Sequence, residues 1–132
     1  MAADNVSNMK KIFVIDDYND DLTLMQNALT GAGYNVHCFN TCLSAYDRVN
    51  DLKPDLIVTD VFLEFGASSG LASIVHFRKS FPDLPIVAVS GYKKYLDMVE
   101  YLDLDVSFTF EKSMSYEKLV KKIDELFKGA DA

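Results

Sequence analysis

The sequence is poor in cysteine and has no long apolar run. Its two cysteines, Cys38 and Cys42, are too few for a disulfide scaffold, and no second pair completes a zinc site. No stretch approaches the roughly 18 apolar residues that a membrane-spanning helix needs. The first residues also lack the apolar segment of a signal peptide. We therefore expect a soluble, cytoplasmic domain with no membrane partner.

Basic residues are scarce relative to acidic ones. Thirteen lysines and arginines stand against twenty aspartates and glutamates, which gives a formal net charge of -7. Such a balance repels phosphate backbones, so direct binding of nucleic acid by this chain is not expected. The 132 residues suffice for one ordinary domain with a buried core. We expect a flexible N-terminus over residues 1–9 and one domain over residues 10–128.

Five short apolar runs alternate with segments of helical spacing. The runs cover residues 11–16, 35–39, 55–60, 85–90 and 106–110. The first, third and fourth are almost continuously apolar, as in strands that are buried on both faces. The helical segments cover residues 22–29, 43–52, 71–77, 95–102 and 119–127. This alternation predicts an α/β fold, a five-stranded parallel doubly wound sheet in the order 2-1-3-4-5 with helices on both faces.

The first helical segment has clear signals at both ends. Asn19 or Asp20 is expected to be its N-cap, and Gly31 and Gly33 to end it. Asp20 and Asp21 would complement the helix dipole rather than bind a ligand.

Polar side chains stand where the predicted strands end. The first strand ends in Asp16 and Asp17, the third in Asp60 and the fourth in Ser90, and the fifth runs into Lys112. Since ligands bind at the carboxyl ends of such strands, these groups would converge on one rim. Three crowded carboxylates repel one another unless a cation joins them, and Mg²⁺ prefers oxygen ligands. Asp60 could then attack phosphorus, while Mg²⁺, Ser90 and Lys112 neutralise the phosphoryl charge.

These residues, in this order at consecutive strand ends, resemble the receiver domain of bacterial two-component response regulators over about residues 10–127. The resemblance implies a flavodoxin-like, CheY-like receiver of the stand-alone type, with no output domain. Such a receiver is a signalling phosphoprotein rather than an enzyme. It takes a phosphoryl group from a histidine kinase or a histidine phosphotransfer protein, in a two-component system or phosphorelay. At most it phosphorylates itself from small phosphodonors with Mg²⁺ and slowly loses the group again.

The resemblance also assigns individual roles. It implies that Asp60 is the phosphoacceptor and that Asp17 and Asp60 bind Mg²⁺ directly, together with the backbone carbonyl of Phe62. Asp16 would act mainly through a metal-bound water. Ser90 and Lys112 would contact the phosphoryl oxygens and report their arrival, with Ser90 as one switch residue.

The sequence departs from the family pattern at three positions. Glu64 and Ser113 stand where the family usually has proline, and Thr109 stands where the fifth strand usually carries an aromatic switch residue. Phe108 and Phe110 flank Thr109 but would point to the opposite face, unless a bulge exchanges them. These departures leave an alternative: a pseudo-receiver, an interaction module that keeps the fold without using phosphorylation.

Two further expectations concern phosphoryl lifetime and partners. In this family the Phe62 and Tyr92 positions tune the lifetime of the acyl phosphate. Neither side chain offers an amide or carboxylate to position water, so we expect slow self-dephosphorylation. The segment 92–102 carries Tyr95 and Tyr101, and tyrosine is enriched at interfaces. Because the family commonly signals through the fourth helix, fifth strand and fifth helix, a downstream protein is expected to dock there.

Overall fold

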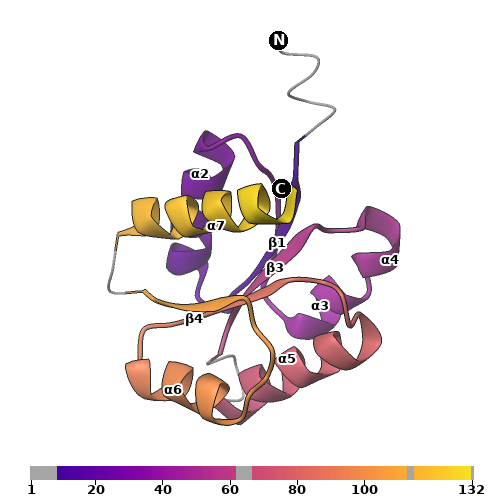
Figure 1. Cartoon of the computed structure of the whole chain (residues 1–132), viewed down its shortest axis with the longest axis vertical. Coiled ribbons are helices and arrows are strands. Elements are labelled where there is room, and N and C mark those ends of the chain that lie inside the picture. Colours follow the sequence, from indigo (N-terminus) through magenta and orange to yellow (C-terminus); the bar gives the residue numbers. More distant parts are fainter. Residues whose placement is uncertain (1–8, 62–66, 113–114, 132) are drawn as a thin grey trace.

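The protein is built on a parallel sheet of five strands (Figure 1). The computed structural model describes residues 9–61, 67–112 and 115–131. The strands are β1 (Lys11–Ile15), β2 (Asn35–Phe39), β3 (Leu56–Asp60), β4 (Ile86–Ser90) and β5 (Phe108–Glu111). They lie in the order β2-β1-β3-β4-β5, and each neighbouring pair is parallel. The predicted fold class and strand order are confirmed.

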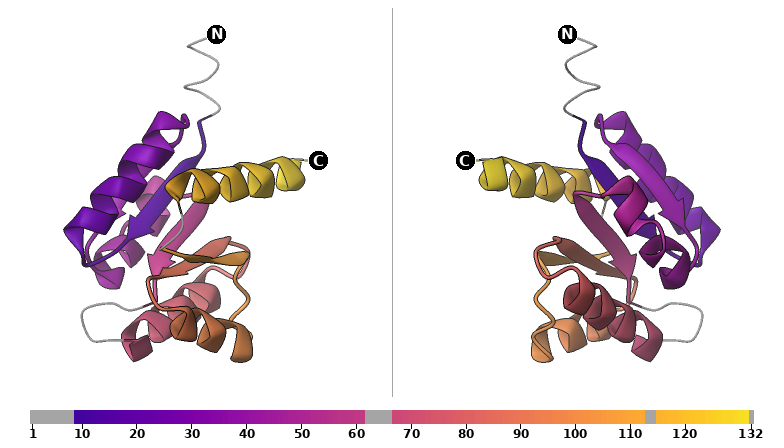
Figure 2. Two further views of the ribbon diagram at one scale, coloured as in Figure 1. Left: turned by 90° about the vertical axis from the view of Figure 1, so that its left-hand side faces the viewer. Right: turned by 90° about the vertical axis from the view of Figure 1, so that its right-hand side faces the viewer.

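Helices cover both faces of the sheet (Figures 1 and 2). One face carries α2 (Asn19–Gly31) and α7 (Tyr116–Asp131). The other carries α3 (Cys42–Tyr46), α4 (Val49–Leu52), α5 (Ala67–Ser80) and α6 (Lys93–Tyr101). Among the described residues, no helix combines the length and the apolar composition needed to cross a bilayer.

Each face of the sheet has its own buried core. In β1, Val14 belongs to the cluster with Met25 of α2, whereas Phe13 belongs to the cluster with Phe77 of α5. Successive side chains of a strand point to opposite faces, so a strand covered on both sides must be apolar throughout. This is why the runs at β1, β3 and β4 lack the polar alternation of a half-exposed strand.

Some predicted boundaries are wrong. Tyr18 rather than Asn19 or Asp20 is the N-cap of α2, and no side chain caps it. The predicted helix 43–52 is two short helices, because the backbone N–H of Arg48 bonds three residues back to Ala45 and tightens the turn there. The fifth strand spans Phe108–Glu111 rather than residues 106–110.

The orientation of β5 agrees with the alternation in its sequence. Phe108 and Phe110 both pack in the core beneath α2 and α7. Thr109 faces the other way, and its hydroxyl donates a hydrogen bond of 3.3 Å to Glu100 of α6. The pairing with β4 is continuous from Phe108 to Glu111, so no bulge brings an aromatic residue to the Thr109 side.

Candidate functional site

Three carboxylates meet at the carboxyl-terminal rim of the sheet. Asp16 and Asp17 follow β1, and Asp60 ends β3; one carboxylate oxygen from each lies within 4.8 Å of the others. The Asp16 side chain is fully buried and accepts a hydrogen bond of 2.9 Å from the backbone N–H of Tyr18. Asp60 is buried as well, whereas Asp17 is exposed. The cluster therefore has a buried floor and one acid open to solvent.

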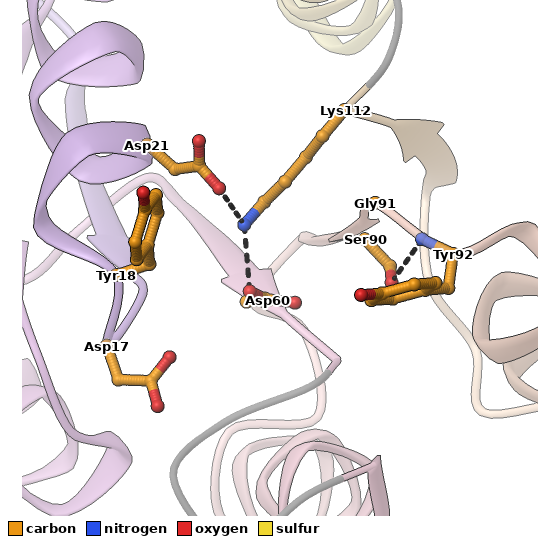
Figure 3. A pocket seen from close by; sticks show the side chains of 8 residues that line it. All are labelled: Asp17, Tyr18, Asp21, Asp60, Ser90, Gly91, Tyr92 and Lys112. Carbon is orange, nitrogen blue, oxygen red and sulfur yellow. Dashed lines mark hydrogen bonds and ion pairs between the residues drawn. The ribbon is translucent and has the colours of Figure 1, made fainter.

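Lys112 reaches into this cluster from the end of β5 (Figure 3). Its Nζ lies 2.5 Å from Asp16 Oδ2, 2.8 Å from Asp60 Oδ2 and 2.9 Å from Asp21 Oδ2. Its side chain is only 10% exposed. A single ammonium thus binds carboxylates that come from three different parts of the chain.

Burial and hydrogen bonding act in opposite directions on the charged groups of the site. Burial raises the pKa of Asp16 to about 6, although the hydrogen bonds from Lys112 and Tyr18 oppose that rise. For Lys112, burial would lower the pKa, but the hydrogen bonds to Asp16 and Asp60 outweigh it, so the pKa rises above its usual value. Lys112 is therefore firmly cationic, while the pKa of Asp16 lies nearer to neutral pH than that of an ordinary aspartate.

Ser90 connects the lysine with the neighbouring strand. The backbone N–H of Lys112 donates to the carbonyl of Ser90 at 2.8 Å, which extends the β4–β5 pairing by one residue. The Ser90 hydroxyl accepts a hydrogen bond of 3.0 Å from the backbone N–H of Tyr92. A cavity of about 500 Å³ opens above these groups, and its lining residues are Asp17, Tyr18, Asp21, Asp60, Ser90, Gly91, Tyr92 and Lys112.

A family model agrees with this arrangement of fold and site. The model of the response regulator receiver domain matches residues 12–124 of the chain. The chain belongs to the response regulator receiver family. This confirms the resemblance inferred from the strand ends.

Known relatives of this receiver domain include longer proteins. The transcriptional regulatory protein ZraR of Escherichia coli K12 is 26% identical over 125 residues, which cover 95% of this chain and 27% of that protein. The ZraR of Klebsiella oxytoca is 25% identical over 114 residues, 86% of this chain and 25% of that protein. The chain thus spans about a quarter of the length of these curated relatives.

Solved structures share the receiver fold. A CheY-like response regulator receiver domain protein from Methanospirillum hungatei superposes with a TM-score of 0.83 at 21% identity, covering 94% of this chain and 98% of that one. The response regulator TrrA from Thermotoga maritima, solved in complex with Mg²⁺-BeF, superposes with a TM-score of 0.78 at 24% identity, covering 89% and 99%.

The chemistry of the receiver's acidic cluster fits a divalent metal ion. Asp16, Asp17 and Asp60 offer carboxylate oxygens from two adjacent strands, and such oxygens are the ligands that Mg²⁺ prefers. Receiver domains bind Mg²⁺ at an acidic site of this kind. In this structure Lys112 occupies one oxygen each of Asp16 and Asp60, so the lysine and a metal ion would share the same carboxylates.

The predicted site residues divide into three groups. Asp16, Asp17, Asp60, Ser90, Lys112 and Tyr92 lie together around the cavity or its floor. Thr109, Tyr95 and Tyr101 do not line the cavity and lie instead on β5 and α6. Phe62, Glu64 and Ser113 fall outside the described residues.

Sequence reasoning missed the part played by Asp21. We expected it to complement the dipole of α2, but its carboxylate pairs with Lys112 and lines the cavity. The sequence carried no signal for this role, because Asp17 precedes the helix and an acid in the first helical turn is already explained by the helix dipole.

Proposed function

We propose that this receiver accepts a phosphoryl group on Asp60 in the presence of Mg²⁺ and signals through a partner protein. The observation that carries the proposal is the contact of Lys112 Nζ with both Asp16 and Asp60 at the floor of an open cavity. Nucleophile, acidic cluster and cation are thereby within reach of one phosphoryl group. A pseudo-receiver would need none of these contacts, so that alternative is not favoured.

Each side chain has a role that its position supports. An oxygen of Asp60 attacks phosphorus, while Asp16 and Asp17, together with the predicted carbonyl of Phe62, complete the metal site. A bound Mg²⁺ ion supplies positive charge to the phosphoryl oxygens. Lys112 contributes its ammonium on the side of Asp60 Oδ2. Ser90, on the adjacent strand, offers its hydroxyl to another phosphoryl oxygen.

The phosphoryl group would come from a histidine kinase or a histidine phosphotransfer protein and would be lost slowly. Tyr92 lines the cavity beside Asp60 and has neither an amide nor a carboxylate that could position an attacking water. A bulky ring there shields phosphorus instead. A phosphoryl lifetime of only seconds in Mg²⁺ buffer would contradict this part of the proposal.

The downstream partner would dock on the face formed by α6, β5 and α7. Tyr101 is 89% exposed there, whereas Tyr95 packs partly against the core, so Tyr101 is the stronger contact candidate. Three lysines of α7 border a hollow of about 310 Å³ beside Thr109; they are Lys118, Lys121 and Lys122. Tyrosine is enriched at surfaces that bind other proteins, which supports Tyr101 as a contact.

Intact-mass spectrometry tests the phosphoacceptor. The wild type, Asp60→Asn and the control Asp83→Asn, an exposed aspartate far from the acidic cluster, would be incubated with Mg²⁺ and acetyl phosphate. The wild type and Asp83→Asn should each gain one phosphoryl group, Asp60→Asn none, and EDTA should abolish the gain. Absence of labelling under conditions that label an ordinary receiver would favour the pseudo-receiver.

A further inference from the structure

We propose that Tyr18 and Tyr92 form an aromatic subsite that holds the imidazole ring of the phosphodonor above Asp60. The proposal rests on the phosphoacceptor function and names the group that the cavity binds. Both tyrosines line the cavity of about 500 Å³, and their side chains are 58% and 59% exposed. Figure 3 shows the two rings on opposite sides of Asp60, one from the start of α2 and one from the start of α6.

The backbone of each tyrosine is fixed to a residue of the site. The N–H of Tyr18 donates to Asp16 Oδ1 at 2.9 Å, and the N–H of Tyr92 donates to Ser90 Oγ at 3.0 Å. The ring of Tyr92 also packs edge-on against Tyr95, with ring centroids 5.6 Å apart and an angle of 74° between the planes. The backbone from which each ring projects is therefore tied to the reacting groups, and the Tyr92 ring is also held by its contact with Tyr95.

The two tyrosine rings favour a donor whose leaving group is aromatic. A phosphohistidine carries phosphorus directly on its ring, so a phosphorus atom approaching Asp60 brings the ring into the cavity. Aromatic rings attract one another at centroid distances of about 4.5–7 Å. Acetyl phosphate leaves as an anion without a ring and gains no such contact.

The transfer balances with this donor. An oxygen of the Asp60 carboxylate forms the new P–O bond as the P–N bond breaks. The electron pair of the P–N bond goes to the ring nitrogen, and the proton on the other ring nitrogen stays in place. The ring thus leaves as neutral imidazole, and no further reactant is required.

A comparison of two small donors tests the subsite. Phosphorylation rates with phosphoimidazole and with acetyl phosphate would be measured for the wild type, Tyr18→Leu, Tyr92→Leu and the matched variants Tyr18→Phe and Tyr92→Phe. Each Leu variant should lower the ratio of the phosphoimidazole rate to the acetyl phosphate rate by about 2- to 10-fold. The Phe variants keep the ring and should preserve this ratio. Leu24→Ala, an exposed substitution elsewhere on α2, should leave both rates unchanged.

The outcomes separate this inference from the phosphoacceptor function. If neither donor labels the wild type or any variant, the phosphoacceptor function itself is refuted. Labelling with an unchanged rate ratio in the Leu variants would overturn only the subsite. If the Leu variants slow transfer from a histidine-phosphorylated protein but not from phosphoimidazole, the rings contact the partner's surface rather than its imidazole, which also overturns the proposal.

A second readout requires neither metal nor phosphorylation. In metal-free protein, saturation-transfer NMR should carry magnetisation from the wild type to the ring protons of free imidazole. The transfer should weaken in the Tyr18→Leu/Tyr92→Leu double variant and persist in the double Phe variant. Equal transfer to all three proteins would overturn the subsite.

Discussion

The ammonium of Lys112 organises the acidic cluster at the level of single residues. It binds oxygens of Asp16, Asp21 and Asp60, and Asp16 is completely buried. Removing the cation would leave these carboxylates to repel one another with only solvent and any bound metal to compensate. The lysine therefore stabilises the metal-free fold and also competes with a divalent ion for the same oxygens.

Lys112→Met should lower the free energy of unfolding in EDTA by about 1 to 3 kcal/mol, because buried acceptors lose a charged donor. The gain in stability on adding Mg²⁺ should be larger in the variant than in the wild type, since the lysine no longer opposes the metal. Urea unfolding with and without Mg²⁺ measures both effects. An equal Mg²⁺ gain in the two proteins would show that lysine and metal do not share ligands.

His37 makes the stability of the fold depend on pH. Burial, with smaller contributions from Lys11 and Arg48, lowers the pKa of this imidazole below 6.5, and its Nε2 is buried without a hydrogen-bond partner among the described residues. Because the folded state takes up its proton at lower pH than the unfolded state, the unfolded state binds more protons as pH falls through about 6.5.

The wild type should therefore lose stability relative to His37→Phe as pH falls from neutrality through the range of the histidine. The phenyl ring keeps the apolar contact with Phe13, whose ring centroid lies 5.9 Å from that of His37. Chemical denaturation at a series of pH values gives the difference in unfolding free energy. Parallel curves for the two proteins would contradict the lowered pKa.

Single residues also mark the limit of sequence reasoning. Asp16, Asp60 and Lys112 could be predicted because each stands at a strand end, and parallel topology brings such ends together. Asp21 could not be assigned in the same way, since acids in a first helical turn are explained by the helix dipole alone. The contact between the Lys112 ammonium and the Asp21 carboxylate exists only in the folded structure, and it shows that Asp21 belongs to the site.

At the scale of elements, Gly70 fixes how closely α5 approaches β3. A Cβ atom at this position would overlap the backbone carbonyl of Val61, the residue that follows Asp60. The helix backbone therefore lies directly against the segment that carries the phosphoacceptor. Any side chain there must move either the helix or the end of the strand.

Gly70→Ala should destabilise the fold by about 1–3 kcal/mol through overpacking. It should also slow phosphorylation of Asp60, because the end of β3 must shift. The matched control is Gly129→Ala, an open helical position in α7, which should be neutral or more stable by about 0.5–1 kcal/mol. Denaturation and intact mass give the two readouts, and a Gly70→Ala protein as stable and as reactive as the wild type would disprove the close approach.

The element boundaries show why some predictions succeed and others fail. The limits of β2 are as predicted, because its run is framed by turn residues on both sides. The helix predicted over residues 43–52 breaks at Arg48, where one hydrogen bond closes three rather than four residues back. Apolar spacing persists across such a tightened turn, so periodicity cannot reveal it.

At the scale of the whole molecule, the acidic cluster and the proposed docking face share one strand pair. The backbone of Lys112 bonds to Ser90, and the residue pairs from Val87–Phe108 to Ser90–Glu111 join β4 to β5. Thr109 in turn reaches Glu100 of α6 through its hydroxyl. A displacement of Ser90 or Lys112 toward a phosphoryl group would therefore pull on β5 and disturb the Thr109–Glu100 contact.

Hydrogen–deuterium exchange tests this coupling. Loading Asp60 with Mg²⁺ and beryllofluoride, a phosphoryl mimic, should change amide exchange in α6 and β5 but not at the C-terminal end of α2. The contacts of Ser90 and Lys112 continue through β5 to Glu100 of α6, and a bound group can bias this path between two states. Asp60→Asn under the same conditions should show no change in either region. If protection alters only beside the cavity, around residues 16–21 and 90–92, the site does not communicate with the α6–β5–α7 face and signalling must use another surface.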